Sequence, residues 1–201
     1  MTASQPGPQP GAGEQALLVV IEVPKGCQNK YEYDPKLGRM VLNRVLYSPV
    51  YYPGEYGFVP DTLAEDGDPL DVLVMSTIST FPGCAVPVRV LGALDMHDDK
   101  GPDTKILAVV SVDPRLEQVR AFDQVPPHFL REVEHFFRVY KELEGKTCVI
   151  HGWRREPEAW QLIREARERA AAARKQVTLP LGPDGLAAPA AGGARPASTA
   201  P

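Results

Sequence analysis

Three carboxylates lie within one six-residue segment, Asp66-Gly67-Asp68-Pro69-Leu70-Asp71. Asp66 and Asp68 point to the same side if the chain is extended, because side chains alternate along a strand. Pro69 restrains the backbone and favours a turn that brings Asp71 toward the other two carboxylates. The apolar sequence DVLV starts at the last of these residues, so we expect the cluster to lie at the mouth of a strand.

A second acidic group, Asp98, Asp99 and Asp103, falls in the segment 95–103, which we expect to be a loop between two strands with a Gly-Pro turn. If the fold brings both groups together, five or more carboxylates share one cavity. Two like charges about 4 Å apart repel by about 4 kcal/mol at an effective dielectric of about 20, so such a cluster needs cations. Ligands that are all oxygen select a hard ion, Mg²⁺ before Mn²⁺ or Ca²⁺.

Basic and phenolic side chains come from separate segments of the chain. They are Lys30, Arg44, Lys105, Lys141, Tyr52, Tyr56 and Tyr140. Arginine can grip a phosphate with two hydrogen bonds, lysine contacts it as a point charge, and a phenol donates a hydrogen bond without adding charge. Cations beside a carboxylate–metal cluster are typical of phosphoryl transfer.

Each of these residues also has a plainer interpretation. A lone Asp is often a turn former, the tyrosines could pack in the core, and Lys141 could be a solvated helix charge. Two other acidic motifs fit poorly. An EF-hand loop counted from Asp66 would place Leu70 and Thr77 where it needs a polar ligand and a glutamate. An aspartyl-nucleophile phosphatase would have its acidic pair directly after an apolar strand.

Short β-rich runs separated by Gly, Pro and Asp predict strands over 16–23, 30–34, 39–46, 71–78, 85–94, 105–112 and 147–153. Their spacing favours a small closed barrel. Apolar residues at helical spacing predict a helix from Pro126 and Pro127 to Gly145. A second helix is expected over 157–176, where Ala, Arg and Glu dominate. The predicted fold class is α+β, a β-barrel with helices packed outside.

Composition sets the remaining limits. Hydrophobic residues make up 43% and charged residues 24% of the 201 residues, which is typical of one globular domain. The net charge of −4 argues against a general nucleic-acid binder. The three cysteines cannot form a complete disulfide set and no stretch could span a membrane, so we expect a cytoplasmic protein. Pro/Gly-rich 1–16 and Ala/Pro/Gly-rich 176–201 are expected to be disordered tails around a domain at 17–175.

The motifs together resemble the soluble family I inorganic pyrophosphatases in their bacterial form. DGDPLDV (66–72) is similar to the family signature D-[SGDN]-D-[PE]-[LIVMF]-D-[LIVMGAC]. The supporting matches are VVIEVPKG (19–26), KYEYD (30–34), YYPGEYGFVPDT (51–62), DDKGPDTK (98–105) and HFFRVYKELE (135–144). The resemblance covers roughly Leu17 to Arg169, with several motifs in one order.

The resemblance implies an OB-like five-stranded β-barrel with helices outside, usually assembled as a homohexamer in bacteria. It implies Mg²⁺-dependent hydrolysis of pyrophosphate to two orthophosphates by a metal-activated water, without a covalent intermediate. Several Mg²⁺ ions would serve each site, with Mn²⁺ as the alternative ion. Neither a nucleic acid nor a membrane is implied as a partner.

The resemblance also implies roles for residues. Asp66, Asp71 and Asp103 would hold the first activating metal, with Asp71 bridging to the second. Asp98, with Asp103, would hold metals that arrive with the substrate, and Glu22 would act on a metal through waters. Asp68 would be the general base. The phosphate-binding residues would be Lys30, Arg44, Tyr56, Tyr140 and Lys141, with Tyr52 and Lys105 as further members and Glu32 in support. Glu55 stands where many relatives carry Asn.

Two other functions are alternatives to pyrophosphate hydrolysis. A non-enzymatic OB-like module that binds oligonucleotides predicts a basic face with exposed aromatics, which the clustered aspartates oppose. A different phosphohydrolase could act on nucleotides, but a Nudix-type enzyme needs an REx₂EE-like helix, and the sequence has none.

Overall fold

The computed structural model describes residues 16–177, with side chains to Lys175. The two tails expected at 1–16 and 176–201 therefore lie outside the described residues, apart from Ala16 and the last two residues of α2. No helix in the described part of the chain is long and apolar enough to cross a membrane.

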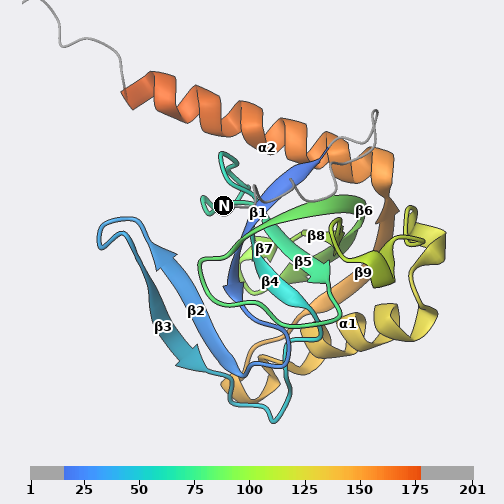
Figure 1. Cartoon of the computed structure of the whole chain (residues 1–201). Coiled ribbons are helices and arrows are strands. Elements are labelled where there is room, and N and C mark those ends of the chain that lie inside the picture. The colour runs from blue at the N-terminus through green and yellow to red at the C-terminus, as the bar shows by residue number, and fades with distance from the viewer. Residues whose placement is uncertain (1–15, 178–201) are drawn as a thin grey trace, which may run out of the picture.

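Five strands form a closed ring at the centre of the fold (Figure 1). They are β1 (Leu17–Val23), β4 (Glu55–Phe58), β5 (Asp71–Met75), β8 (Lys105–Val110) and β6 (Ala85–Asp98). Neighbouring strands are antiparallel except β5 and β8, which run parallel, and the ring closes where β1 pairs with β6. The predicted OB-like five-stranded barrel is confirmed.

Burial explains why these segments form strands. Val19, Ile21 and Val23 alternate along β1 and are completely buried, so one face of the strand lines the core. Strands β5 and β8 are instead apolar almost throughout, because β5 is buried from Val72 to Met75 and β8 from Lys105 to Val109. A strand that is covered on both faces has no need for polar alternation.

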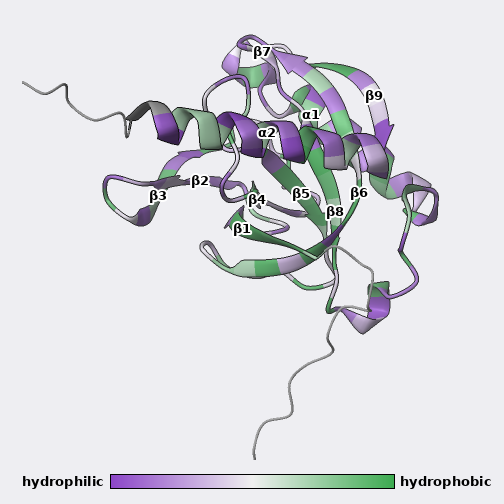
Figure 2. Ribbon diagram, turned by 90° about the horizontal axis from the view of Figure 1, so that it is seen from above, coloured by the Kyte–Doolittle hydropathy of each residue, from purple (hydrophilic) through white to green (hydrophobic). Residues whose placement is uncertain are grey.

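The helices α1 (Pro127–Val139) and α2 (Glu156–Val177) lie on different sides of the barrel (Figure 1). Ala159, Ile163 and Ala166 of α2 pack in the same core cluster as the strands. On α1, Phe136 and Phe137 are buried in a second cluster that includes Tyr56. Figure 2 shows apolar colour concentrated on the barrel strands, while α2 carries much polar colour.

A separate two-stranded hairpin projects from the barrel (Figure 1). Its strands are β2 (Asn29–Asp34) and β3 (Arg39–Val45), which pair antiparallel. Further along the chain, β7 (Gly101–Pro102) and β9 (Val149–Arg155) extend the main sheet by pairing with β6. Short 3₁₀ turns lie at Pro114–Leu116 (η1), Phe122–Gln124 (η2) and Glu142–Glu144 (η3).

Three element predictions need correction. Strand β4 was not predicted, because it has only four residues and one of them is a glycine, Gly57. The structure needs glycine there, since a Cβ would lie 1.9 Å from the carbonyl oxygen of Val20. The expected loop over 95–103 is shorter, since β6 continues to Asp98 and then turns directly into β7. Helix α1 ends at Val139 instead of reaching Gly145, and η3 forms the remaining turn.

Candidate active site

The centre of the site is a buried lysine between two aspartates. Strands β5 and β8 are parallel and pair Val72 with Ile106, so their first residues, Asp71 and Lys105, start side by side. The Lys105 Nζ atom donates hydrogen bonds to Asp71 and to Asp103. Lys105 is only 3% exposed. Its Nζ lies 5.7 Å from the ring centroid of Tyr56 and 5.9 Å from that of Phe137.

The three charges set each other's protonation. Burial alone lowers the pKa of Lys105, but Asp71 and Asp103 outweigh it and hold that pKa above its ordinary value. Burial raises the pKa of Asp103, and Lys105 offsets this only in part. Lys105 is therefore charged at neutral pH and serves as a fixed counter-ion for both carboxylates.

A second carboxylate–lysine pair joins the β6–β7 hairpin to the end of α1. Lys141 Nζ lies 2.6 Å from Asp98 Oδ2, and 5.2 Å from the ring centroid of Tyr140. Burial opposes the charge of Asp98, but the hydrogen bonds from Lys141 and from the Lys100 amide, with the nearby lysine charges, together outweigh it and lower the pKa of that carboxyl. Burial also lowers the pKa of Lys141, but Tyr140 and Asp98 raise it overall. Burial raises the pKa of Tyr140 to about 12, so its phenol stays protonated.

The acidic hexapeptide forms a tight exposed turn before β5. The Asp68 amide donates to Asp66 Oδ1 at 3.1 Å, and Gly67 between them has a φ of +92°. The Leu70 amide donates to Thr62 Oγ1 at 2.9 Å and ends the turn. Partial burial and the charge of Asp66 raise the pKa of Asp68. The segment is a turn and not an extended chain, so the alternation expected for Asp66 and Asp68 does not apply, and what joins them is the bond from the Asp68 backbone amide.

Glu22 on β1 belongs to the same electrostatic group. Its Oε1 accepts a hydrogen bond from the Tyr33 amide at 2.8 Å. Burial raises the pKa of Glu22 to about 7, and the charges of Asp71 and Glu32 add to that effect. Asp71 also raises the pKa of Asp68 and of Asp103, so it is the carboxylate that links this group electrostatically.

The hairpin carries two further predicted residues, and each has an acidic partner. Lys30 Nζ lies 2.6 Å from Glu32 Oε1, and Arg44 Nε lies 2.8 Å from Glu144 Oε1. Glu144 was not predicted from the sequence, and neither was Asn43, whose side chain contacts both Glu32 and Arg44. The only sequence feature that could have indicated Glu144 is its position in the segment 135–144, which is similar to the family.

Tyr52 and Tyr56 lie in the core beneath the site. They are 1% and 6% exposed, and their ring centroids are 5.1 Å apart. Tyr52 also packs on Phe136 at 4.7 Å. Burial raises the pKa of both phenols well above the ordinary value, so both are neutral hydrogen-bond donors. The rings of both tyrosines therefore pack in the core, as the plainer interpretation of these residues expects.

Glu55, the departure from the familiar pattern, is completely buried in β4. Its Oε1 accepts hydrogen bonds from the amides of Lys25 and Thr80, each at 3.2 Å, and its Oε2 contacts the Thr80 hydroxyl. The carboxylate thus joins the segment after β1 to the segment after β5, next to Tyr56.

The donor set fits a hard divalent cation. Among residues 16–177, no three His, Cys, Asp or Glu side chains gather closely enough to hold an ion as they stand. Asp71 and Asp103 instead share Lys105, and Asp98 pairs with Lys141. Burial is the main cause of the raised pKa values of Glu22 and Asp103, and the charge of Asp71 adds to both. Ligands that are all oxygen suit Mg²⁺ or a similar ion.

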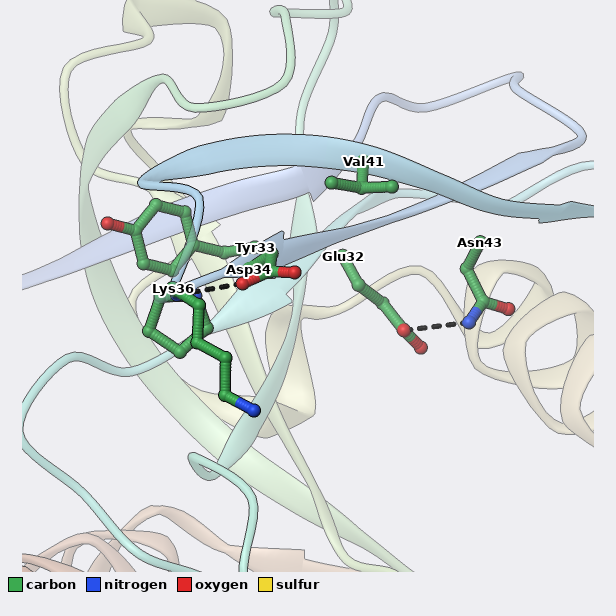
Figure 3. A pocket seen from close by; sticks show the side chains of 7 residues that line it. Glu32, Tyr33, Asp34, Lys36, Val41 and Asn43 are labelled. Atoms are coloured by element: carbon green, nitrogen blue, oxygen red, sulfur yellow. Dashed lines mark hydrogen bonds between the residues drawn. The ribbon is translucent and has the colours of Figure 1, made fainter.

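A shallow hollow of about 350 Å³ lies on the hairpin, apart from the Lys105 centre (Figure 3). Glu32, Tyr33 and Asp34 line it from β2, with Pro35, Lys36, Val41 and Asn43. Figure 3 shows the Asn43 amide bonded to the Glu32 carboxylate at one end and Asp34 with Lys36 at the other. Only Glu32 of this group belongs to the predicted site, so the hollow meets the site at its edge.

A closed five-stranded barrel with helices outside, and with carboxylates, lysines and phenols gathered at the start of two parallel strands, is typical of a metal-dependent enzyme that acts on phosphates. The sequence profile of the family described as "Inorganic pyrophosphatase" matches residues 19–171. The chain belongs to the inorganic pyrophosphatase family.

Individual relatives agree with that assignment. The inorganic pyrophosphatase of Methanosarcina acetivorans is 50% identical over 155 residues, which cover 77% of this chain and 92% of the relative. That of Thermus thermophilus is 51% identical over 153 residues, covering 75% and 87%. The Thermus thermophilus crystal structure superposes with a TM-score of 0.76 at 47% identity over 84% of this chain and 97% of that one.

Proposed function

We propose that this chain hydrolyses inorganic pyrophosphate to two orthophosphates with the help of Mg²⁺, without a covalent intermediate. The observation that carries the proposal is the pair of neighbouring charge clusters, Asp71–Lys105–Asp103 and Asp98–Lys141, in a chain of this family. Fixed carboxylates and fixed ammonium groups in one place suit a substrate that is a polyanion bound with cations.

The metal-holding residues in this proposal are Asp66, Asp71 and Asp103 for a first ion, Asp98 with Asp103 for others, and Glu22 through water. A bound divalent cation supplies neutralisation of phosphate oxygens and makes a water more acidic. Mn²⁺ is the alternative ion, since its ligand preferences are close to those of Mg²⁺.

Asp68 is the proposed general base. Within residues 16–177 its carboxylate forms no ion pair, whereas Asp71 and Asp98 each bond to a lysine. A carboxylate with open oxygens can take a proton from the attacking water at one of them. Its raised pKa makes it a stronger base than an ordinary aspartate.

The proposed phosphate ligands come from separate elements of the fold. The cationic members are Lys30, Arg44, Lys105 and Lys141, and the phenolic members are Tyr52, Tyr56 and Tyr140, with Glu32 supporting Lys30. The cations stabilise charge on the leaving phosphate, and the neutral phenols donate hydrogen bonds.

Phosphate release from pyrophosphate by the full chain tests the proposal, with Mg²⁺, with EDTA, and with Asp68→Asn. The expected result is release that stops with EDTA and falls about 10²- to 10⁴-fold in the variant. Asp123→Asn is the matched control, because Asp123 is an exposed aspartate that pairs with Arg155. A folded protein that releases no phosphate with Mg²⁺ or Mn²⁺ would refute the proposal.

We further propose a homo-oligomer, a hexamer by family resemblance, in the cytoplasm. Exposed apolar side chains such as Tyr47, Tyr51 and Phe81 support an assembly, since they are 58–65% exposed in the single chain. The three cysteines are free thiols, in keeping with a reducing compartment. Light scattering coupled to gel filtration measures the assembly directly, and a monomeric mass would refute it.

A further inference from the structure

A continuous set of hydrogen bonds links the two cations of the hairpin. Lys30 Nζ donates to Glu32 Oε1 at 2.6 Å, and the other oxygen of Glu32 accepts from Asn43 Nδ2 at 2.8 Å. Asn43 Oδ1 then accepts from Arg44 Nη1 at 3.1 Å. The Arg44 Nε atom donates to Glu144 Oε1 at 2.8 Å.

The backbone of β3 makes this arrangement possible. Lys30 pairs with Arg44, but the next residue of β2, Tyr31, pairs with Leu42, so Asn43 is the extra residue of a β-bulge. Neighbouring side chains of a regular strand point to opposite faces. The bulge removes that alternation and allows the Asn43 and Arg44 side chains to bond to each other. Bulges next to active sites commonly aim a side chain in this way.

The chemistry of Asn43 suits its position between unlike charges. Its amide nitrogen can donate to the Glu32 carboxylate while its oxygen accepts from the Arg44 guanidinium. An aspartate of the same size has two acceptors and no donor, so it would repel Glu32. Asn43 therefore joins an acidic and a basic group that a charged residue could not join.

Glu144 connects the hairpin to a distant segment. It lies in η3, just after Tyr140 and Lys141, one hundred positions along the chain from Arg44. Its side chain is 9% exposed and that of Arg44 is 22% exposed. An ion pair that is largely removed from water holds its partners more firmly than a surface pair. Glu144 therefore fixes Arg44 relative to the segment that carries Lys141.

The two anchors leave part of the guanidinium for a ligand. Nε and one Nη1 hydrogen are used by Glu144 and Asn43, and within residues 16–177 no acceptor takes the Nη2 hydrogens. We propose that Asn43 and Glu144 are positioning residues that hold Lys30 and Arg44 as one array toward the phosphate oxygens of pyrophosphate. The inference rests on the proposed function, and it predicts that losing either residue weakens substrate binding more than it slows turnover.

Steady-state hydrolysis of pyrophosphate at saturating Mg²⁺ tests this in Glu144→Ala and Asn43→Asp. We expect KM to rise about 10-fold while kcat changes less than about 3-fold, because a lost positioning contact acts on binding shared by ground state and transition state. Glu142→Gln is the matched control, since Glu142 is an exposed glutamate in the same turn whose side chain forms no hydrogen bond or ion pair with the described residues 16–175.

A double-mutant cycle separates positioning from general damage to the fold. In an Arg44→Ala background, Glu144→Ala should raise KM by less than about 2-fold, because its action passes through Arg44. Equal effects of Glu144→Ala with and without Arg44, or an unchanged KM in both single variants, would overturn the inference. If the wild type and Glu142→Gln both fail to hydrolyse pyrophosphate, the proposed function fails instead.

Discussion

Lys105→Met removes the cation at the centre of the site and keeps an unbranched apolar side chain there. Two carboxylate oxygens that bond to the same nitrogen lie within about 5 Å of each other. At an effective dielectric of about 20, their repulsion is about 3 kcal/mol once the lysine is gone. We expect the free energy of unfolding at pH 7 in EDTA to fall by about 3 kcal/mol, near the usual cost of breaking a buried ion pair.

The loss should depend on pH and on metal. Without Lys105, repulsion between the two carboxylates raises the pKa of Asp103 further above that of an ordinary aspartate. The penalty is therefore complete above about pH 6 and disappears as pH falls toward about 4, where the carboxyls are protonated in both states. Saturating Mg²⁺ at pH 7 should also reduce it, because a cation replaces the missing charge.

Urea unfolding followed by circular dichroism, at a fixed protomer concentration, measures these differences. Lys36→Met is the control, since Lys36 is an exposed hairpin lysine and its loss should change stability by less than about 0.5 kcal/mol. If Lys105→Met loses the same stability at pH 5, at pH 7 and in Mg²⁺, Lys105 acts by packing on Tyr56 and Phe137 and the electrostatic reasoning is wrong.

Three further outcomes follow from named contacts. Glu55→Leu should lower the free energy of unfolding by about 3 kcal/mol, because two partly buried amides and a hydroxyl lose their acceptor, and Glu55→Gln should cost less in the same urea assay. Gly57→Ala should cost more than about 3 kcal/mol in thermal unfolding, since its Cβ would lie 1.9 Å from the Val20 carbonyl oxygen; a near-neutral result would contradict the close approach of β1 and β4. Burial raises the pKa of Glu22 to about 7, and a cation favours the charged form, so Mg²⁺ binding should release protons and weaken as pH falls below about 7. Calorimetry in two buffers of different ionisation enthalpy checks the release, and identical heats would argue against it.

Much of the fold could be predicted because its strands carry local signals. The alternation in β1 and the apolar runs of β5 and β8 indicate strands without knowledge of their partners. Strand β4 has no such local pattern, because it forms where β1 packs closely against Gly57, which is a non-local contact. The early end of α1 could not be predicted either, because the apolar spacing continues to Tyr140 and Leu143 while the backbone turns at Val139.

The candidate site was predictable as a set of residue types, and its pairings were not. The spacing in 66–71 predicted Asp66 and Asp68 on one side of an extended chain, but the backbone turns at Gly67 and the Asp68 amide bonds to Asp66 instead. That Lys105 would lie between Asp71 and Asp103 depends on the parallel pairing of β5 with β8, which is non-local. Asn43 was missed because only the bulge in β3 turns it toward Arg44.

The ring of strands closes between the beginning of β1 and β6, at Leu17 with Val88. A nascent chain therefore holds β1 without one of its two neighbours until β6 has been made. Such pairing between distant segments costs loop entropy before it gains contacts, and all-β rings accordingly fold in milliseconds to seconds rather than microseconds. Lys141 follows α1, later still in the chain. Partly synthesised chains thus lack one of the proposed phosphate ligands, so under the proposed function binding of pyrophosphate would report that folding is finished.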